Sequence, residues 1–308
     1  MTTAIAATEA TRDAEKVKPA RKQRHLGWMF GTAWLVVLSV CALFANQLPF
    51  IRTYDAKIKI AGKAKGYNFG PGWTAWLGTD NSSHDVFARC IYGARQTLII
   101  GIGATIIGLT VGGLLGVIAG YYRGWVDRVV SVIVDCLLAM PALLLALLLI
   151  QRTDQIKETI TALGWLTRTE EITVTLGVLA IAPFARIVRA QTLGLRERDF
   201  VLAARSLGAK SQRVIWREIM PNLVPAMVTV AVTGLGILIA AEGTLAFLGL
   251  GVPRPQTWGT MIDAARDDLS KAWWATMFPC LFLFLTVLSF NFIGDHLARK
   301  FDIREAAV

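Results

Sequence analysis

Charged and chemically reactive side chains are scarce in this chain. Of its 308 residues only 18% are charged while 54% are hydrophobic, a composition that excludes an ordinary soluble protein. The three histidines, His25, His84 and His296, lie far apart in different polar segments, so a metal site built from them is not expected. Neither Gly-x-Ser-x-Gly nor His-Glu-x-x-His occurs, and without a nucleophile–base or metal constellation a membrane enzyme is disfavoured.

Paired cysteines and a phosphate-binding loop are also missing. The four cysteines are scattered without paired spacing, which argues against a disulfide framework or a zinc site; they are Cys41, Cys90, Cys136 and Cys280. The segment LGAKS at 207–211 resembles a phosphate loop, but that loop needs a glycine directly before its lysine, and here Ala209 precedes Lys210. We therefore expect the chain to bind no cofactor of its own.

Apolar stretches near 20 residues make up most of what is present. Each is about long enough to cross ~30 Å of hydrocarbon. The sequence therefore predicts an all-α membrane protein with six transmembrane helices, at 27–48, 97–121, 129–150, 172–187, 223–248 and 273–294. Prolines are expected to kink the third, fourth and sixth of these spans, at Pro141, Pro183 and Pro279.

Lys and Arg residues gather in the polar tail 1–26 and in the segment 186–222. Because these residues favour the cytoplasmic side, both termini, including the short tail 303–308, and the segment 186–222 are expected in the cytoplasm. Anionic lipid, rather than nucleic acid, then explains the net charge of +10. The N-terminal tail lacks the apolar core of a signal peptide and is expected to be disordered.

The long segment 49–96 is expected on the external side. Asp80 or Asn81 is expected to cap a short helix that runs through Asp85–Tyr92 into the second span. At the start of the sixth span, two adjacent tryptophans indicate the external membrane interface; they are Trp273 and Trp274.

A ladder of small residues runs through the second span. Gly108, Gly112, Gly116 and Gly120 are each four residues apart, and Ala104 extends the series. Spacing of four places them on one helical face, where small side chains let another helix approach closely. This pattern predicts that the second span lies inside a helix bundle.

Ionisable residues within the spans are few. Asp135 lies in the third span, Glu242 in the fifth and Asp295 at the end of the sixth. Carboxylates in a bilayer are costly and are usually paired or face water. Asp135 and Glu242 could form a proton or cation relay, or they could accept hydrogen bonds from backbone or arginine donors at helix contacts. The second, structural interpretation is the stronger because no intramembrane lysine or histidine accompanies them.

The segment between the fourth and fifth spans is unusually well patterned for a connection. Asp199 is expected to cap a helix over 200–207, and Ser211 a second helix over 212–220 that Pro221 ends. Gly208 between them suits a left-handed helix end. We refer to this segment as the 196–222 loop.

Both predicted helices of the 196–222 loop are amphipathic. In the first, an apolar face opposite Arg205 is expected; it comprises Val201, Ala204 and Leu207. In the second, an apolar face opposite Arg213 and Arg217 is expected; it comprises Val214, Ile215 and Ile219. A structured basic surface of this kind suits a protein partner, although an interfacial helix lying on lipid would show a similar pattern.

The segment LAARSLGAKSQRVIWREIMPN resembles the EAA loop of ATP-binding-cassette importer permeases. That pattern has Glu-Ala-Ala, three residues, Gly, nine residues and then a hydrophobic residue near a closing Leu-Pro. Leu202 stands where the family has Glu, Glu218 where Ile is usual and Met220 where Leu is usual. Matched positions and their neighbours that we expect to contact an ATPase are Leu202, Ala203, Ala204, Arg205, Gly208, Ala209, Lys210, Ser211 and Pro221.

The resemblance extends over nearly everything from about residue 75 to 302. Segments similar to the C-type permease of dipeptide and oligopeptide importers are LGTD at 77–80, DV at 85–86, IYGAR at 91–95, AGYYRGWVD at 119–127, VDCLLAMPALLLAL at 134–147, FLGLGVPRPQTWGTM at 247–261 and LTVLSFNFIGDHLA at 285–298. The family tends to have Gly-Arg-Asp where this chain has Ser83, His84 and Asp85.

The resemblance implies a type I importer permease fold in a bacterial cytoplasmic membrane, with a five-helix core at 97–302 and the 196–222 loop as its coupling element. It implies a second homologous permease, two ATPase subunits that bind ATP and Mg, and an extracytoplasmic peptide-binding protein as partners. It also implies a non-catalytic subunit that moves di- or oligopeptides. Glutathione, a nickel chelate or another solute stays open, as does a gradient-driven secondary transporter using Asp135 and Glu242.

Overall fold

The computed structural model describes residues 26–59, 67–159 and 166–305, and within them it is helical apart from turns and isolated bridges. Residues 1–25 of the predicted N-terminal tail and residues 306–308 lie outside the described residues. The long helices are α2 (Leu26–Leu43), α3 (Val86–Tyr122), α4 (Gly124–Ala139), α5 (Ala142–Thr159), α6 (Arg168–Arg196), α9 (Met220–Leu245) and α11 (Trp273–Glu305). The shorter ones are α7 (Asp199–Ser206), α8 (Ser211–Arg213), the π-helical turns η2 (Val214–Ile219) and η3 (Ala246–Leu250), α10 (Trp258–Ala265) and the turn η4 (Arg266–Asp268).

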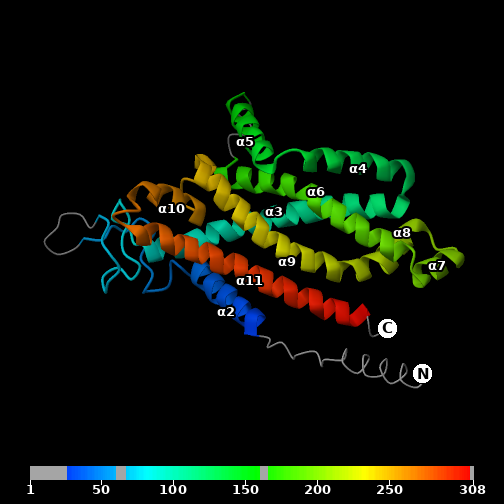
Figure 1. Ribbon diagram of the computed structural model, residues 1–308, viewed down its shortest axis with the longest axis horizontal. Helices are drawn as coiled ribbons and strands as arrows, with labels where there is room; N and C mark the ends of the chain where they lie inside the picture. The colour runs from blue at the N-terminus through cyan, green and yellow to red at the C-terminus, as the bar shows by residue number, and fades with distance from the viewer. Residues whose placement is uncertain (1–25, 60–66, 160–165, 306–308) are drawn as a thin grey trace, which may run out of the picture.

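Five helical segments are long and apolar enough to cross a membrane, and a sixth results if α4 and α5 together form one span. The five are α2, α3, α6, α11 and the continuous helix over 211–250. Figure 1 shows α3, α6, α9 and α11 side by side along the long axis of the molecule. We call the end that carries α7 the loop end, and the end that carries residues 44–59, residues 67–85 and α10 the distal end.

The predicted third span is not one kinked helix. Its two halves, α4 and α5, are bent by 95° at Met140 and Pro141. Met140 is extended, with φ −78° and ψ 137°, because proline disfavours the helical conformation of the residue before it. In contrast, α6 continues through Pro183 and α11 through Pro279, as membrane helices commonly do. α11 also extends to Glu305, beyond the start of the predicted C-terminal tail.

The cap of α3 differs from the prediction. Asp85, rather than Asp80 or Asn81, is the N-cap, and its carboxylate accepts a hydrogen bond from the Phe87 amide at 2.9 Å. Asp80 instead organises the preceding turn, because its Oδ1 accepts from the Ser82 and His84 amides, each at 2.8 Å. The turn at 80–84 is therefore folded back onto the start of α3.

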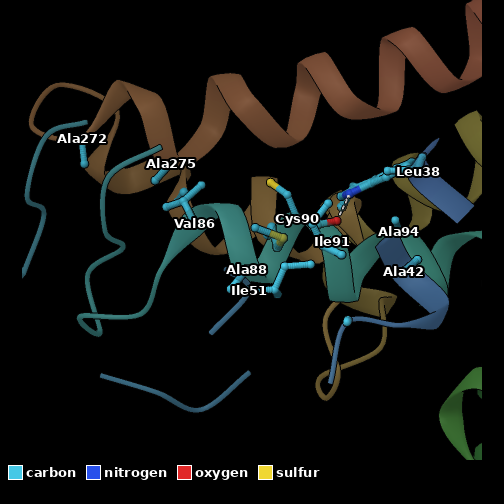
Figure 2. Close-up of a cluster of buried hydrophobic side chains, with 14 residues drawn as sticks. Leu38, Ala42, Ile51, Val86, Ala88, Cys90, Ile91, Ala94, Ala272 and Ala275 are labelled. Carbon is cyan, nitrogen blue, oxygen red and sulfur yellow. Dashed lines mark hydrogen bonds between the residues drawn. The ribbon is translucent and has the colours of Figure 1, made fainter. Parts of the chain in front are cut away.

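The distal end has its own apolar core. Figure 2 shows side chains from α2, the start of α3 and the start of α11 meeting there, among them Leu38, Val86, Ile91 and Ala275. The fully buried Trp258 of α10 donates from its indole to the Cys90 carbonyl at 2.9 Å. This core fixes the first turns of α3 and α11 against α10.

Candidate functional site: the 196–222 loop and the intramembrane charges

The first helix of the 196–222 loop ends in a Schellman motif centred on Gly208. Gly208 has φ +80°, and its amide donates to the Arg205 carbonyl at 2.9 Å. The Ala209 amide reaches back to the Ala204 carbonyl at 3.1 Å, which completes the pair of bonds that defines this helix end. A side chain at position 208 would meet nothing within 4 Å, so the backbone conformation, not space, selects glycine.

The expected caps of this loop are not made. Asp199 is the first residue of α7 and Arg198 occupies the cap position, while Lys210 occupies the cap position ahead of Ser211. Neither cap residue makes a side-chain capping bond. The turn at Gly208 therefore defines the helix–turn–helix shape without side-chain caps.

The second helix does not end at Pro221. Residues 211–250 form one continuous helical segment, so the loop runs directly into α9. Within the π-helical turn before Pro221, the Met220 amide donates to the Ile215 carbonyl, five residues back. This wider turn accommodates a proline, which has no amide to donate, in the first turn of α9.

The underside of the 196–222 loop rests on the end of α3. Val201, Val214 and Ile219 are buried against Tyr121. The guanidinium of Arg205, which was expected to face away, lies over the Tyr121 ring at 4.8 Å from its centroid. An exposed ion pair between Arg123 and Glu197, 3.0 Å long, also joins the end of α3 to this region.

The 196–222 loop exposes large apolar side chains as well as basic ones. Leu207, expected on the buried face, is instead 89% exposed because α7 ends one residue earlier. Leu202 and Trp216 are also exposed. The exposed basic residues around them are Lys210, Arg213 and Arg217. Exposed large apolar side chains beside charged residues are typical of a protein-binding surface.

The glycine ladder of α3 lies against α6. A Cβ at Gly108 would come 2.5 Å from the Ala180 Cβ, and one at Gly112 would come 2.5 Å from the Ile181 carbonyl oxygen. Gly116 and Gly120 meet the backbone of α6 at similarly short range, and Ala104 is fully buried. These small residues let α3 and α6 pack backbone to backbone at the centre of the bundle.

The intramembrane carboxylates occupy separate places. Asp135 of α4 is exposed and forms an ion pair with Arg186 of α6. Glu242 of α9 is fully buried; Thr257 is the polar side chain that faces it, and neither carboxyl oxygen has a well-formed hydrogen bond among the described residues. Asp295 is exposed near the end of α11. Asp135 therefore has the arginine partner that the structural interpretation expected.

A second ion pair between α4 and α6 lies nearer the loop end. Asp127 of α4 binds Arg189 of α6 through both carboxylate oxygens, with Nη2 to Oδ2 at 2.8 Å. Sequence reasoning missed Asp127, Arg186 and Arg189. Their spacing was a usable signal, because two acids eight residues apart and two arginines three apart each share a helical face.

Another charge cluster, also missed from the sequence, joins α5 to the start of α6. The buried Glu171 carboxylate accepts from Lys157 at 2.8 Å and from Arg168 at 3.0 Å, and Arg168 also binds Asp154. These charges lie at the distal end of α6, where a capping box between Thr167 and Glu170 begins the helix. They hold the bent α4–α5 pair against the bundle.

Polar side chains at the distal end form a further network. Arg89 of α3 donates to Asp80 at 2.8 Å and to Gln256 at 3.0 Å, and it lies over the Tyr54 ring. Burial, reinforced by the charge of Arg89, lowers the pKa of His84. Burial raises the pKa of Asp85, against the lowering effect of its backbone hydrogen bonds. This network connects Tyr54 and Asp80, which precede α3, to Gln256 in the loop before α10.

Comparison with known proteins assigns the chain. Residues 112–304 match the family of binding-protein-dependent transport system inner membrane components. The glutathione transport system permease protein GsiD of Pectobacterium atrosepticum is 37% identical over 271 residues, covering 88% of this chain and 85% of that protein. The dipeptide transport system permease protein DppC of Alkalihalophilus pseudofirmus is 36% identical over 234 residues, covering 76% and 73%.

Solved structures share the fold. The MetNI methionine ABC transporter in an inward-facing conformation matches with a TM-score of 0.58 at 20% identity, covering 71% of this chain and 99% of that one. An amino acid ABC transporter with histidines matches with a TM-score of 0.54 at 17% identity, covering 70% and 94%. The chain belongs to the binding-protein-dependent inner membrane permeases, the multi-pass, non-catalytic membrane subunits of ATP-binding-cassette importers for peptide-like solutes.

Proposed function

We propose that this chain is one of two homologous permeases that together form the pathway of a peptide importer. Two ATPase subunits, which bind ATP and Mg, dock on the cytoplasmic loops of the permeases, in this chain on the 196–222 loop. An extracytoplasmic binding protein delivers di- or oligopeptides. The observation that carries this proposal is the exposed apolar surface around Leu207, held by Gly208 on a helix end of defined geometry. On this arrangement the loop end and both termini are cytoplasmic.

Coupling follows from how the 196–222 loop is attached. Its second helix is continuous with α9, so a displacement of the docked surface is transmitted to a membrane-spanning helix without an intervening flexible link. ATP-driven closure of the ATPases would then bias the spans between inward- and outward-open arrangements. Leu202, in place of the family's Glu, gives the contact an apolar side chain where a polar one is usual.

Glutathione is a second candidate substrate. The GsiD and DppC relatives match at nearly the same identity, so neither substrate is preferred by similarity. Glutathione is itself a peptide-like molecule with a free ammonium group and free carboxylates. The two candidates therefore share the chemistry that a pathway would meet.

The test of coupling is Leu207→Asp in the assembled complex. We expect the variant to insert normally, because Leu207 makes little contact within the chain, yet to lose most ATPase copurification and ATP-dependent uptake of labelled dialanine or glutathione in proteoliposomes. Leu269→Asp, the same substitution at an exposed distal position, is the matched control. Uptake that follows a proton gradient without ATPase subunits would contradict the proposal and favour a secondary transporter.

A further inference from the structure

A hollow lies between α4 and α6, beside the two ion pairs that join these helices. It has a volume of about 440 Å³ and is lined by Ser131, Asp135, Arg186, Arg189 and three small apolar side chains. This volume falls within the ~300–1,000 Å³ range of small-molecule sites. We call it the α4–α6 groove.

The charged residues of α6 indicate where the α4–α6 groove lies along the length of that helix. Glu171, with its partners Lys157 and Arg168, marks the distal boundary of the apolar part of α6. Arg186 follows Glu171 by about 23 Å along the helix at ~1.5 Å per residue, which is less than the ~30 Å thickness of the hydrocarbon. The Asp135–Arg186 pair therefore lies where the apolar part of α6 ends, at the start of the 186–222 segment.

The exposure of this pair is incompatible with lipid. The side chains of Arg186 and Asp135 are 58% and 61% exposed on the surface of the chain. Charges at this position face water or protein, because exposure to hydrocarbon is costly. A hollow beside the pair, rather than a flat surface, favours a water-filled pathway over close packing against a neighbouring helix.

The two ion pairs of the α4–α6 groove differ in what they leave available. Asp127 holds Arg189 through both carboxylate oxygens, and that pair is the more buried. Arg186 contacts Asp135 through one nitrogen and one oxygen. Among the described residues, the second Asp135 oxygen and the remaining Arg186 donors are thus available to a ligand in the hollow.

We infer that the α4–α6 groove is a binding site for the free ends of the transported peptide, with Arg186 receiving the carboxylate and Asp135 the ammonium group. This inference rests on the proposed function. A guanidinium binds a carboxylate through parallel hydrogen bonds, and the Asp135 carboxylate complements an ammonium. The ligand class is a zwitterion, whose two charges match a site that carries one charge of each sign. Asp127 and Arg189 are positioning residues that fix α4 against α6.

The experiment uses the whole complex in nanodiscs, purified without the binding protein so that its selectivity does not contribute. Binding of radiolabelled dialanine is measured beside N-acetyl-dialanine amide, which lacks both charged ends. We expect saturable binding of dialanine, no saturable binding of the capped peptide, and a loss of at least about tenfold in affinity for Arg186→Gln and for Asp135→Asn. Arg254→Gln removes an equally exposed ion pair at the distal end and should bind within about twofold of the parent complex.

A second measurement tests the groove independently, in case the Arg186 or Asp135 variants fail to assemble. In a chain whose four cysteines are replaced by alanine, Ser131→Cys should react with a water-soluble maleimide, and dialanine should slow that reaction. Absent dialanine binding, equal binding of the capped peptide or unchanged affinity in both groove variants would overturn the inference, as would labelling that dialanine does not slow. ATPase copurification and ATP-dependent uptake in the same preparation separate this failure from failure of the proposed function.

Discussion

At the distal end the side chains are joined by buried hydrogen bonds, whereas at the loop end α7 rests on its neighbours through a few apolar contacts. Arg89 alone binds Asp80 and Gln256 and lies over Tyr54. The 196–222 loop is held by a small cluster around Tyr121 and an exposed ion pair. Apolar contacts are not directional, so the loop can shift as a unit on α3, while the distal network fixes one arrangement.

The largest expected effect comes from breaking the distal network. Arg89→Leu leaves the buried Asp80 carboxylate without its cation, and we expect a loss of roughly 3 kcal/mol in the free energy of unfolding. Thermal unfolding of the purified chain in detergent measures it. Arg254→Gln, which breaks the exposed pair with Asp55, should cost about 1 kcal/mol or less. Equal shifts in the two variants would show that burial does not distinguish these pairs.

A smaller effect is expected at Gly208. Gly208→Ala forces an L-residue to φ +80° and should cost about 1 kcal/mol at the helix end, lowering uptake while the spans stay intact. Gly208→Asn is the matched control, because asparagine tolerates the left-handed conformation and nothing lies within 4 Å to obstruct it. Uptake and limited proteolysis of the loop are the measurements. If both variants transport equally poorly, contact with the ATPase rather than backbone strain limits this position.

The smallest expected effect is a pH dependence of the distal end. The pKa of His84 is lowered in the folded chain from its ordinary value of 6.5, so the unfolded chain takes up a proton first as the pH falls. Neutral His84 therefore does not reduce the free energy of unfolding above pH 6.5. Below pH 6.5 the free energy of unfolding falls by at most about 1.4 kcal/mol per pH unit because of this side chain.

The free energy of unfolding of the parent chain and of His84→Gln, measured between pH 7.5 and 5, isolates the contribution of His84. The raised pKa of Asp85 acts in the opposite sense and nearer its own ordinary value of 3.8, so it contributes at lower pH. If the free energy of unfolding of His84→Gln still falls with pH in the same way, another group is responsible for the pH dependence.

Local signals in the sequence predicted much of this architecture. Apolar run lengths located the spans, and the glycine spacing of four indicated the face of α3 that meets α6. Gly208 was identifiable because the left-handed conformation strongly favours glycine. These features depend on the chemistry of a few neighbouring residues.

Features that depend on distant contacts were not predictable in the same way. The chain bends by a right angle at Pro141 but stays helical across Pro221. Both positions hold a proline, so the residue type alone does not predict which outcome occurs, and packing decides. Arg205 was expected outward because its helix was considered alone, without the Tyr121 ring of α3 beneath it. The spacing of Asp127 and Arg189 suggested only which helical faces they share, and assigning the pair also required the contact between α4 and α6.

The helix that begins at Ser211 runs through α9 as far as the kink at Gly249, and its length has a mechanical consequence. At ~1.5 Å per residue this helix spans about 60 Å, so a rigid tilt would move its two tips in opposite directions. A tilt of about 10° around its middle would move each tip by about 5 Å, in opposite directions. At the far tip Gly249, with φ +80°, turns the chain toward α10. A push at the loop end would therefore arrive at the distal end with its direction reversed.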